Sequence, residues 1–321
     1  MPLKGYIFLI LALLLSLITS RSSKVIVTIF AGREKYLRIL KSYLDVLLHR
    51  QLLDEIHLWD YSRNENDHRY VAKICNSNPK YMYKSYNKSI VTSYYDYGGP
   101  WRFYYEYYAI SYGYHDNDIL IKCDDDIVYI DVDKFPQYLA IIQNDGLYYA
   151  NIVNNDVCAY IQTKYHVHNL LPFSELPYPQ ALEFGCADPL SGRFNDSRPG
   201  WWTNHAKAKA IHSMFLRNRY KFVINETRVI HWGSRVSINF FGSKVSLIKR
   251  YYKLYLDNDI DDEGFLSARI LKIVGSTNKI VPFFSVVHFS FSYQHSSALD
   301  RMFLKSYYAM SEYLNTRAMH L

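Results

Sequence analysis

The stretch Asp118-Ile119-Leu120-Ile121-Lys122-Cys123-Asp124-Asp125-Asp126-Ile127-Val128-Tyr129-Ile130-Asp131 decides the fold of this chain. It begins with β-branched residues and leucine, a run typical of a buried strand, and then turns abruptly into three carboxylates. Apolar residues return at once, where a solvated turn would usually carry Gly, Asn, Ser or Pro. The pattern predicts a buried strand, an acidic tip and a short link into a helix that ends near Ile142. Asp131 and Asp133 are both suitable N-caps, and Pro136 favours Asp133 because the proline then lies in the first turn.

The acidic tip is a candidate metal site. Open α/β sheets bind their ligands beyond the carboxyl ends of the strands, which is where Asp124–Asp126 would lie. Three adjacent carboxylates repel one another unless a cation neutralises them, and hard oxygen ligands select magnesium, manganese or calcium. The residues alone leave a solvated acidic turn open as the alternative.

Length and composition restrict the class of protein. The 321 residues are 49% apolar and 21% charged, which is typical of a globular chain with one large α/β domain, or a domain and a subdomain. The net charge of +7 is consistent with an anionic substrate or a membrane surface. The basic residues are scattered and form no known nucleic-acid-binding pattern, so we expect no nucleic-acid partner. The four cysteines include no CxxC pair, which argues against a zinc knuckle.

Residues 1–23 resemble a targeting segment. Tyr6–Thr19 is almost purely apolar but shorter than the roughly 20 residues that a typical spanning helix needs, so it is either a signal-peptide core or a short signal anchor. The poor cleavage site before Arg21 favours the anchor. We therefore expect a single-pass type II membrane protein with a lumenal catalytic domain, as in the ER or Golgi, or a secreted protein if the segment is cleaved. In the lumen the Asn-x-Ser/Thr sites at Asn87, Asn195 and Asn225 would make it a glycoprotein.

The next segment alternates between strand and helix patterns. The expected strands are Lys24–Phe30, Ile56–Trp59 and Tyr81–Tyr86, and the expected helices between them are Glu34–Gln51 and Val71–Asn78. Such a β-α-β-α-β series is typical of a nucleotide-binding half-sheet. The chain has no GxGxxG sequence, so dinucleotide binding is not supported.

The rest of the chain continues this mixed pattern. An aromatic helix, Trp101–Tyr112, leads into the acidic strand, and a further strand, Leu147–Val153, precedes a long irregular segment, Asn154–Arg198. Loops of this length in compact domains are usually functional or disordered. The remaining expected strands are Phe222–Asn225, Thr227–Trp232, Val236–Phe241 and Pro282–Phe291, and the remaining expected helices begin near Ala206, Ser243, Phe265 and Leu299.

The pattern Lys122-x-Asp124-Asp125-Asp126-(Ile/Val) resembles the Asp-x-Asp motif of GT-A glycosyltransferases, and is most similar to that of the fringe and β-1,3-galactosyltransferase type. The similarity in the order of elements covers most of residues 24–292. It implies an α/β fold of the GT-A nucleotide-diphospho-sugar transferase type, with a mixed, mostly parallel central sheet flanked by helices. Residues 24–153 would be the nucleotide-sugar-binding half, 154–292 the acceptor half, and 293–321 a C-terminal helix.

The same resemblance implies the roles of the acidic tip. Asp126 would hold a divalent metal, Mn²⁺ or Mg²⁺, that bridges the nucleotide diphosphate. Asp124 and Asp125 would face the metal's waters and the donor's ribose, and Asp124 would also serve the metal. His288, a lone histidine in the last apolar strand, would complete the ligand set, whereas a hydrogen-bonded core histidine is the alternative.

Further residues are implied as contacts of the donor. The ends of the first strands would hold its base and ribose through Thr28, Phe30, Gly32, Arg33 and Asp60. Arg33 suits a phosphate because a guanidinium binds it in a fixed geometry, although an exposed residue at a helix start is equally compatible with the sequence. Arg102 is a further candidate for the diphosphate.

A second acidic cluster, Asp257–Glu263, precedes the helix expected from Phe265. Ordinary capping explains it equally well, because a helix dipole stabilises carboxylates at its N-terminus. In the resembling family an acidic pair at this place supplies the general base, which points to Glu263, with Asp262 as the second candidate. Gly264 departs from the family pattern, so the assignment is open by one residue.

These observations predict a metal-dependent glycosyltransferase, a hexosyltransferase that moves a sugar from a nucleotide-sugar donor to a glycan hydroxyl with inversion. The donor is expected to be a UDP-sugar. One alternative is a metal-dependent nucleotidyl- or phosphotransferase that uses the same acidic tip. Another is a glycan-binding protein whose site is catalytically inactive.

Overall fold

One β-sheet organises the computed structural model, which describes residues 23–86, 101–143, 146–170, 204–233, 235–256, 262–290, 294 and 296–319. The strand order is β3 (Tyr81–Lys84), β2 (Glu55–Asp60), β1 (Val25–Ala31), β4 (Ile119–Asp124), β8 (Phe240–Lys244), β6 (Tyr148–Val153), β9 (Asn278–His288) and β5 (Ile127–Ile130). Strand β7 (Ile230–Trp232) also pairs with β9.

The sheet is mixed but mostly parallel. β1 pairs in parallel with β2 and β4, β2 with β3, and β6 with β9. β8 lies antiparallel to both β4 and β6, so β4 and β6 share one direction. Among the strands described, β1, β2, β3, β4, β6 and β9 therefore run one way and β5, β7 and β8 run the other. The predicted α/β class with a mixed, mostly parallel sheet is confirmed.

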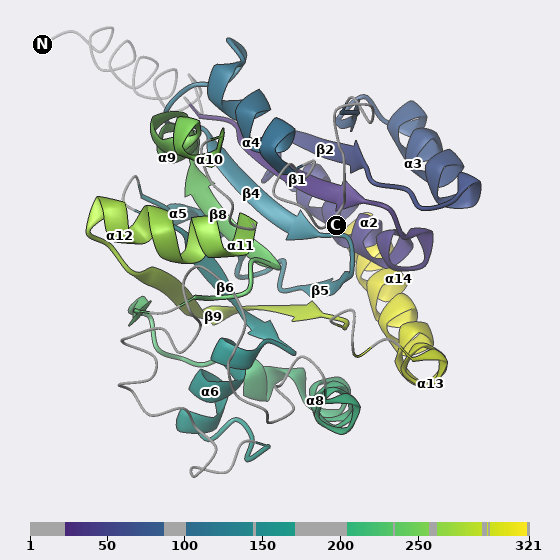
Figure 1. Ribbon diagram of the computed structural model, residues 1–321. Helices are drawn as coiled ribbons and strands as arrows, with labels where there is room; N and C mark the ends of the chain where they lie inside the picture. Colours follow the sequence, from purple (N-terminus) through teal and green to yellow (C-terminus); the bar gives the residue numbers. More distant parts are fainter. Residues whose placement is uncertain are drawn as a thin grey trace, which may run out of the picture.

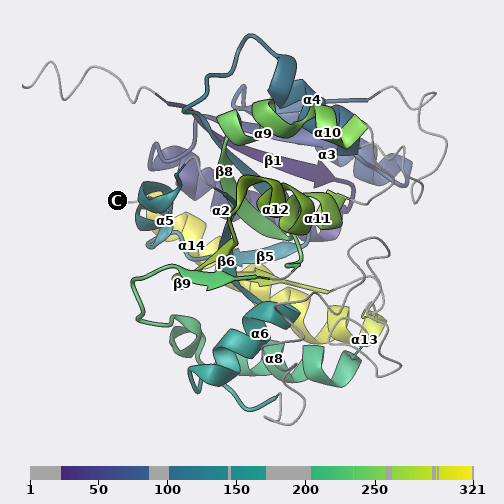
Figure 2. The same ribbon diagram turned by 60° about the vertical axis from the view of Figure 1, so that its left-hand side comes forward.

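The central strands are apolar on both faces, so helices must cover both. Val25, Ile26, Val27 and Ile29 in β1 are at most 2% exposed. On one side α4 (Trp101–Ile110) packs against α9 (Val245–Tyr251), and on the other α2 (Glu34–His49) packs against α14 (Lys305–Met319) and β5. Figures 1 and 2 show these two layers from different directions.

Shorter elements complete the fold. The other α-helices are α3 (Glu65–Ser77), α5 (Phe135–Ile141), α6 (Asp156–Lys164), α8 (His205–Arg217), α10 (Lys253–Leu256), α11 (Asp262–Gly264), α12 (Leu271–Val274) and α13 (Ser297–Leu299). A 3₁₀ turn spans Arg219–Phe222, and π-helical turns span Phe265–Ile270 and Asp300–Leu304.

Several local expectations need correction. The segment expected to be irregular from Asn154 onward begins with α6, because Asn155 is an N-cap whose side chain accepts the Cys158 N–H. Helix α3 starts at Glu65, before the expected Val71, since Asn64 caps it in the same way through the Asp67 N–H.

The link after the acidic tip also differs. It is strand β5, which pairs with β9, and the following helix has Lys134 as its N-cap, not Asp133. The backbone N–H of Lys134 donates to the carbonyl of Asp131 at 3.2 Å, which closes a turn before the helix, and no side chain caps the helix.

The two predicted halves of the chain share the sheet. β8, from the second half, lies between β4 and β6 of the first half. Helix α14 packs on α2, so the C-terminal helix lies against the N-terminal layer. The division into a donor-binding half, an acceptor half and a C-terminal helix therefore remains a prediction about function.

The expected membrane topology is corrected here. Among the residues that the structure describes, no helix is both long enough and apolar enough to cross a bilayer. The structure thus gives no support to the single-pass type II topology with a lumenal catalytic domain that we expected from the sequence. The segment predicted as an anchor is outside the described residues except for Ser23. Of the three glycosylation tripeptides that depended on this localisation, only that of Asn225 is described.

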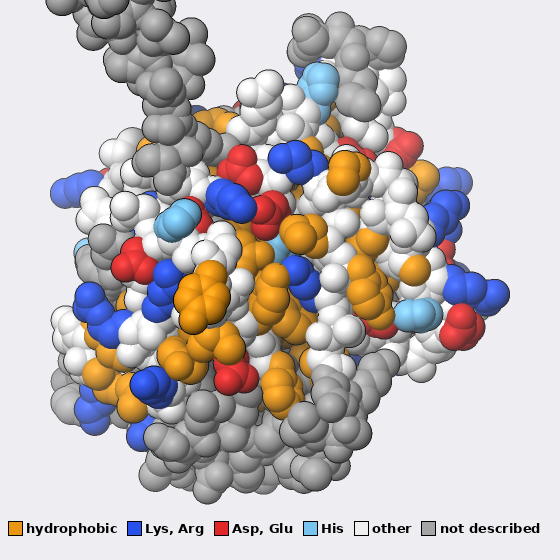
Figure 3. Space-filling view, turned by 90° about the horizontal axis from the view of Figure 1, so that it is seen from above, with side chains coloured by type: hydrophobic (Ala, Val, Ile, Leu, Met, Phe, Trp, Pro, Cys, Tyr) orange, Lys and Arg blue, Asp and Glu red, His pale blue; other side chains and the backbone are white. Residues whose placement is uncertain are grey.

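The surface carries charges of both signs. On the face shown in Figure 3, lysine and arginine side chains alternate with aspartate and glutamate around a band of hydrophobic side chains. No patch of one sign dominates the described part of this face, in line with the scattered basic residues of the sequence.

A buried hydroxyl joins helix α4 to strands β1 and β2. Tyr108, which is 0% exposed, donates to the hydroxyl of Thr28 at 2.8 Å and accepts from Nε1 of Trp59 at 3.2 Å. Its oxygen is also 2.7 Å from Nδ1 of His57. This network connects the layer of α4 to the parallel half of the sheet.

We predict that Tyr108→Phe destabilises the protein by about 1–3 kcal/mol, because the buried N–H of Trp59 loses its acceptor. Urea unfolding measures the change. Tyr112→Phe is the matched control, since Tyr112 is fully exposed at 104% and should not respond. Equal free energies of unfolding for the two variants would show that the network does not stabilise the fold.

Candidate functional site

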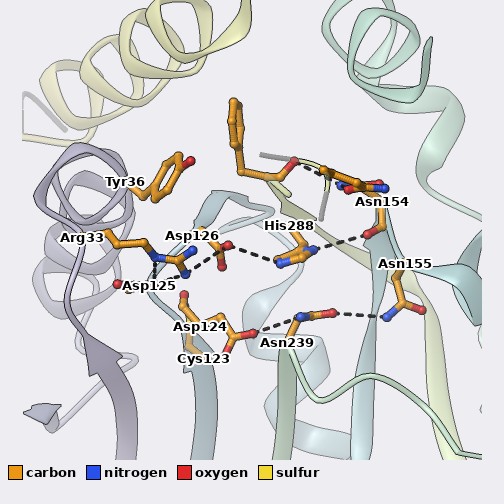
Figure 4. A network of polar contacts seen from close by, with 12 residues as sticks. Arg33, Tyr36, Cys123, Asp124, Asp125, Asp126, Asn154, Asn155, Asn239 and His288 are labelled. Atoms are coloured by element: carbon orange, nitrogen blue, oxygen red, sulfur yellow. Dashed lines mark hydrogen bonds and ion pairs between the residues drawn. The ribbon is translucent and has the colours of Figure 1, made fainter. Parts of the chain in front are cut away.

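The direction of the strands brings the candidate residues to one edge of the sheet. β1, β2, β4, β6 and β9 are parallel, so their carboxyl ends lie together there, and β5 and β8 run opposite, so they begin there. Figure 4 shows the side chains that meet at this edge: Arg33, Asp124, Asp125, Asp126, Asn154, Asn155, Asn239 and His288.

Three side chains at this edge form a possible metal site. Asp124, Asp126 and His288 each offer one ligand atom, and these atoms all lie within 4.8 Å of one another. Asp126 and His288 are buried, and Asp124 is half-buried. Two carboxylate oxygens and one imidazole nitrogen suit a divalent cation such as Mn²⁺. The structure thus brings together the three residues that the sequence proposed as ligands, although metal binding itself stays a prediction.

The imidazole of His288 is oriented by the backbone. Its Nδ1 is 3.4 Å from the carbonyl oxygen of Asn154, which can only accept, so Nδ1 carries the hydrogen of that contact. Nε2 then faces Oδ2 of Asp126 at 3.4 Å. Burial alone would lower the pKa of His288, but the charge of Asp126 raises it above its usual value.

Asp125 points away from this group and holds the turn after β1. Its Oδ2 accepts the backbone N–H of Gly32 at 2.9 Å, and its Oδ1 accepts Nε of Arg33 at 2.8 Å. A Cβ at Gly32 would lie 2.4 Å from the carbonyl oxygen of Tyr61, so only glycine fits here. Asp125, predicted to contact the donor, therefore also fixes the loop that carries Arg33.

Arg33 links Asp125 to the candidate metal site. Its Nη2 is 3.1 Å from Oδ2 of Asp126. Burial alone would lower the pKa of Arg33, but the charges of Asp126 and Asp125 raise it, so the guanidinium stays protonated. Its cationic group is thus held beside the carboxylate that would hold the metal.

Asp124 is held from two sides. The buried ammonium of Lys122 contacts its Oδ1 and donates to the carbonyl of Ile238 at 2.6 Å. On the other side Nδ2 of Asn239 donates to its Oδ2 at 2.9 Å. Burial alone would lower the pKa of Lys122, but Asp124 and then Asp262 raise it.

Two of the other residues predicted to contact the donor are packed against neighbouring parts of the protein. Thr28 is buried within β1. The ring of Phe30 packs on the rings of Tyr61 and Tyr104, with distances between ring centroids of 4.6 and 4.5 Å. Arg102 is in α4, and its side chain is outside the described part. Donor binding by Thr28, Phe30 and Arg102 stays a prediction.

Asp60 ends β2 as a buried carboxylate with several partners. It accepts the Ser62 N–H at 3.0 Å and the Tyr83 hydroxyl at 2.8 Å, and its Oδ2 is 2.7 Å from Nδ1 of His68. Burial alone would raise the pKa of Asp60, but hydrogen bonds from Ser62, Tyr83 and His68 lower it to about 2. The predicted role in donor binding stays untested by this geometry.

The two candidates for the general base differ in their surroundings. Glu263 accepts Nε of Arg235 at 2.6 Å. Asp262 accepts the backbone N–H of Glu263 at 3.0 Å, and its charge helps to raise the pKa of Lys122, the partner of Asp124. The charge of Asp262 thus acts on the group that holds Asp124. Residues 257–261 of this cluster are outside the described part.

Sequence reasoning missed the asparagines of the site. Asn154 and Asn155 directly follow the buried strand β6, and the rule that drew attention to Asp124 could have found them. Asn239 precedes β8, and no local signal marks it because the expected strand covered residues 236–241. Lys122 lies within the acidic motif, but the sequence alone assigns it no role in holding Asp124.

Comparisons with known proteins give only distant similarities. No family model matches the chain, and no curated protein matches it significantly. Among solved structures, 4-diphosphocytidyl-2C-methyl-D-erythritol synthase from Anaerococcus prevotii overlays with a TM-score of 0.43 at 9% identity, over 90% of this chain and 96% of that one.

Two further structures give similar values. The 2-C-methyl-D-erythritol 4-phosphate cytidylyltransferase of Francisella tularensis has a TM-score of 0.39 at 9% identity, covering 87% of this chain and 98% of that one. The inositol-1-phosphate CTP transferase of T. maritima has a TM-score of 0.41 at 10% identity, covering 89% and 96%. These similarities are too low to assign a family. They do not support the narrower fringe and galactosyltransferase type.

We predict that Asp60 makes stability depend on pH in the acid range. Its pKa in the folded protein is about 2, against 3.8 for an ordinary aspartate. A lowered pKa contributes stability that is present above pH 4 and is lost as the pH falls from about 4 to about 2. Urea unfolding of wild type and Asp60→Asn at pH 6, 4 and 2 measures it. The difference between the two proteins should shrink toward pH 2, and a constant difference would contradict the assignment.

Proposed function

We propose that this chain is a divalent-metal-dependent glycosyltransferase that moves a sugar from a nucleotide-sugar donor, a UDP-sugar, to a hydroxyl group of a glycan. One observation carries the proposal: the ligand atoms of Asp124, Asp126 and His288 lie within 4.8 Å of one another. They do so at the carboxyl ends of parallel strands, the edge where open α/β sheets bind nucleotides.

The residues around the acidic tip suit a diphosphate. Asp124, Asp126 and His288 would hold Mn²⁺ or Mg²⁺, which as a Lewis acid would stabilise the charge of the departing nucleotide diphosphate. Arg33, whose pKa is raised by Asp126 and Asp125, supports the proposal because a charged guanidinium can bind a phosphoryl oxygen with two N–H groups.

A carboxylate near the tip would serve as the general base. It takes the proton of the acceptor hydroxyl while that oxygen attacks the anomeric carbon and the bond from this carbon to the diphosphate breaks, which inverts the configuration. Glu263 and Asp262 are the two candidates: Glu263 accepts Nε of Arg235 at 2.6 Å, and the charge of Asp262 acts on Lys122, the partner of Asp124. The closer relationship to fringe and β-1,3-galactosyltransferases rests on the Lys122-x-Asp124-Asp125-Asp126 pattern alone.

Nucleotidyl transfer is the second candidate. The charge at the tip favours it, since Arg33 beside Asp126 and the buried ammonium of Lys122 beside Asp124 place two cations there, and a nucleoside triphosphate carries more negative charge than a diphosphate. In that reaction an oxygen of a phosphorylated acceptor attacks the α-phosphorus, and pyrophosphate leaves. Two of the overlaid structures are named as a cytidylyltransferase and a CTP transferase.

We predict that the full-length protein binds UDP in the presence of Mn²⁺, and that EDTA or Asp126→Ala abolishes this binding, because both remove the cation that neutralises the diphosphate. Isothermal titration calorimetry measures it. Asp133→Ala is the matched control, since this carboxylate lies in the same stretch but its side chain is 78% exposed and pairs with Arg50.

The same titration separates the alternatives. Binding of CTP with Mn²⁺, followed by release of pyrophosphate when a sugar phosphate is added, would favour nucleotidyl transfer. Sugar binding that survives both EDTA and Asp126→Ala would indicate a glycan-binding protein. If UDP, GDP, CMP and CTP all fail to bind with Mn²⁺, the proposal of a nucleotide-dependent transferase is wrong.

We also predict that one of the two substitutions Asp262→Asn and Glu263→Gln lowers kcat by about 10²–10⁴-fold, as expected when a general base is removed. The other substitution should lower kcat less, while the affinity for UDP stays unchanged in both variants. Release of UDP from the UDP-sugar identified by titration measures this. A larger loss in Asp262→Asn would assign the base to Asp262. A larger loss in Glu263→Gln would assign the base to Glu263, and retention of configuration in the product would exclude the base role for both.

A further inference from the structure

Two consecutive asparagines bend the chain where β6 ends. Asn154 has a φ of 63°, in the left-handed region that asparagine tolerates better than most residues. Its side chain holds this bend: Nδ2 donates to the carbonyl of Phe289 at 3.1 Å and to Oε1 of Gln294 at 3.0 Å. The bend is therefore built into the packing around β9.

The bend directs the carbonyl of Asn154 to His288. The carbonyl oxygen of Asn154 lies 3.4 Å from Nδ1 of His288. Nε2, on the opposite side of the same ring, faces Asp126. Asn154 thus sets which nitrogen of His288 faces the candidate metal site.

Asn155 connects the same turn to the other end of the site. Its Oδ1 accepts the Cys158 N–H at 3.1 Å and caps α6, while its Nδ2 donates to Oδ1 of Asn239 at 3.3 Å. Nδ2 of Asn239 in turn donates to Oδ2 of Asp124 at 2.9 Å. Because each amide donates at one end and accepts at the other, neither can rotate without breaking two contacts.

Asn239 is also fixed by its backbone. The antiparallel pairing of β4 with β8 sets Cys123 opposite Phe240, so the next residues, Asp124 and Asn239, face each other. The N–H of Asp124 donates to the carbonyl of Asn239 at 2.9 Å. Asn154 and Asn155 are 0% exposed and Asn239 is 7% exposed, so these contacts are shielded from water.

We propose that Asn154, Asn155 and Asn239 are the positioning residues of the metal site: Asn155 holds Asp124 through Asn239, and Asn154 holds His288. The inference rests on the proposed function, because it assumes that Asp124, Asp126 and His288 bind a divalent cation. Groups that orient metal ligands in this way restrict them to the geometry that the metal requires. The two branches leave from adjacent residues, so one turn aligns ligands that come from distant parts of the chain.

Asn151 provides a matched control on the same strand. It is also 0% exposed, its Nδ2 donates to the carbonyl of Phe222 at 2.7 Å, and its Oδ1 accepts Nε2 of Gln162 at 2.8 Å. Its bonds thus resemble those of Asn155 in burial and kind but do not lead to Asp124, Asp126 or His288.

The test is calorimetric titration of the full-length protein with Mn²⁺ alone. Asn155→Ser keeps an oxygen that can cap α6 but is too short to reach Asn239. Asn155→Ser and Asn239→Ala should each weaken the Mn²⁺ affinity by about 10- to 100-fold, the usual effect of losing a partner of a metal ligand. Asn151→Ser should bind Mn²⁺ as the wild type does. The double variant Asn155→Ser/Asn239→Ala should be no weaker than Asn239→Ala, since both changes break one chain of contacts.

Thermal unfolding in EDTA checks that each variant folds, and Asn155→Ser decides the test if Asn239→Ala does not fold. If the wild type binds Mn²⁺ and both site variants bind it equally well, the positioning role is wrong and the proposed function stands. An equal loss in Asn151→Ser would show that general packing causes the effect, which also overturns the inference. If the wild type itself binds no Mn²⁺, the metal site fails and the proposed function fails with it.

Discussion

The structure depends on charge pairing that stabilises three adjacent carboxylates at the end of a buried strand. Unpaired charges in such a place would be strongly destabilising, so each carboxylate needs a partner within reach. Arg33 lies against Asp125 and Asp126, Lys122 lies against Asp124, and His288 faces Asp126. These partners come from three different strands or strand ends, and the requirement therefore connects β1, β4 and β9.

The sheet topology satisfies this requirement. Because β6 and β9 run parallel to β1 and β4, the ends of all four strands reach the same edge, and β8 starts there because it runs against its neighbours. A reversed β9 would place His288 at the opposite edge. The candidate site is thus a consequence of strand direction more than of any single loop, and its ligands lie at the ends of strands β4 and β9 or in the short turn after β4.

Charge compensation and the proposed reaction would draw on the same groups. Arg33 and Lys122 neutralise the acidic tip within the protein. Of the two, Arg33 is the one with an exposed part, so a phosphorylated substrate would meet its guanidinium. A divalent cation at Asp124, Asp126 and His288 would add to this positive charge, as the proposed binding of a nucleotide diphosphate requires. The asparagines around the tip are neutral and hydrogen-bonded, so they can orient the carboxylates without changing this balance of charge.

The sequence by itself determined the alternation of strands and helices, the central strand with its acidic tip, and the three candidate ligands Asp124, Asp126 and His288. These features depend on local periodicity and on residue chemistry, which a chain displays before it folds. Only the tertiary structure decided that Asp125 turns to Gly32 and Arg33, that Glu263 pairs with Arg235, and that Asn239 faces Asp124. Those contacts join residues that are distant in the chain, and they follow from the register of β4 and β8 and the packing of the layers, which no local pattern records.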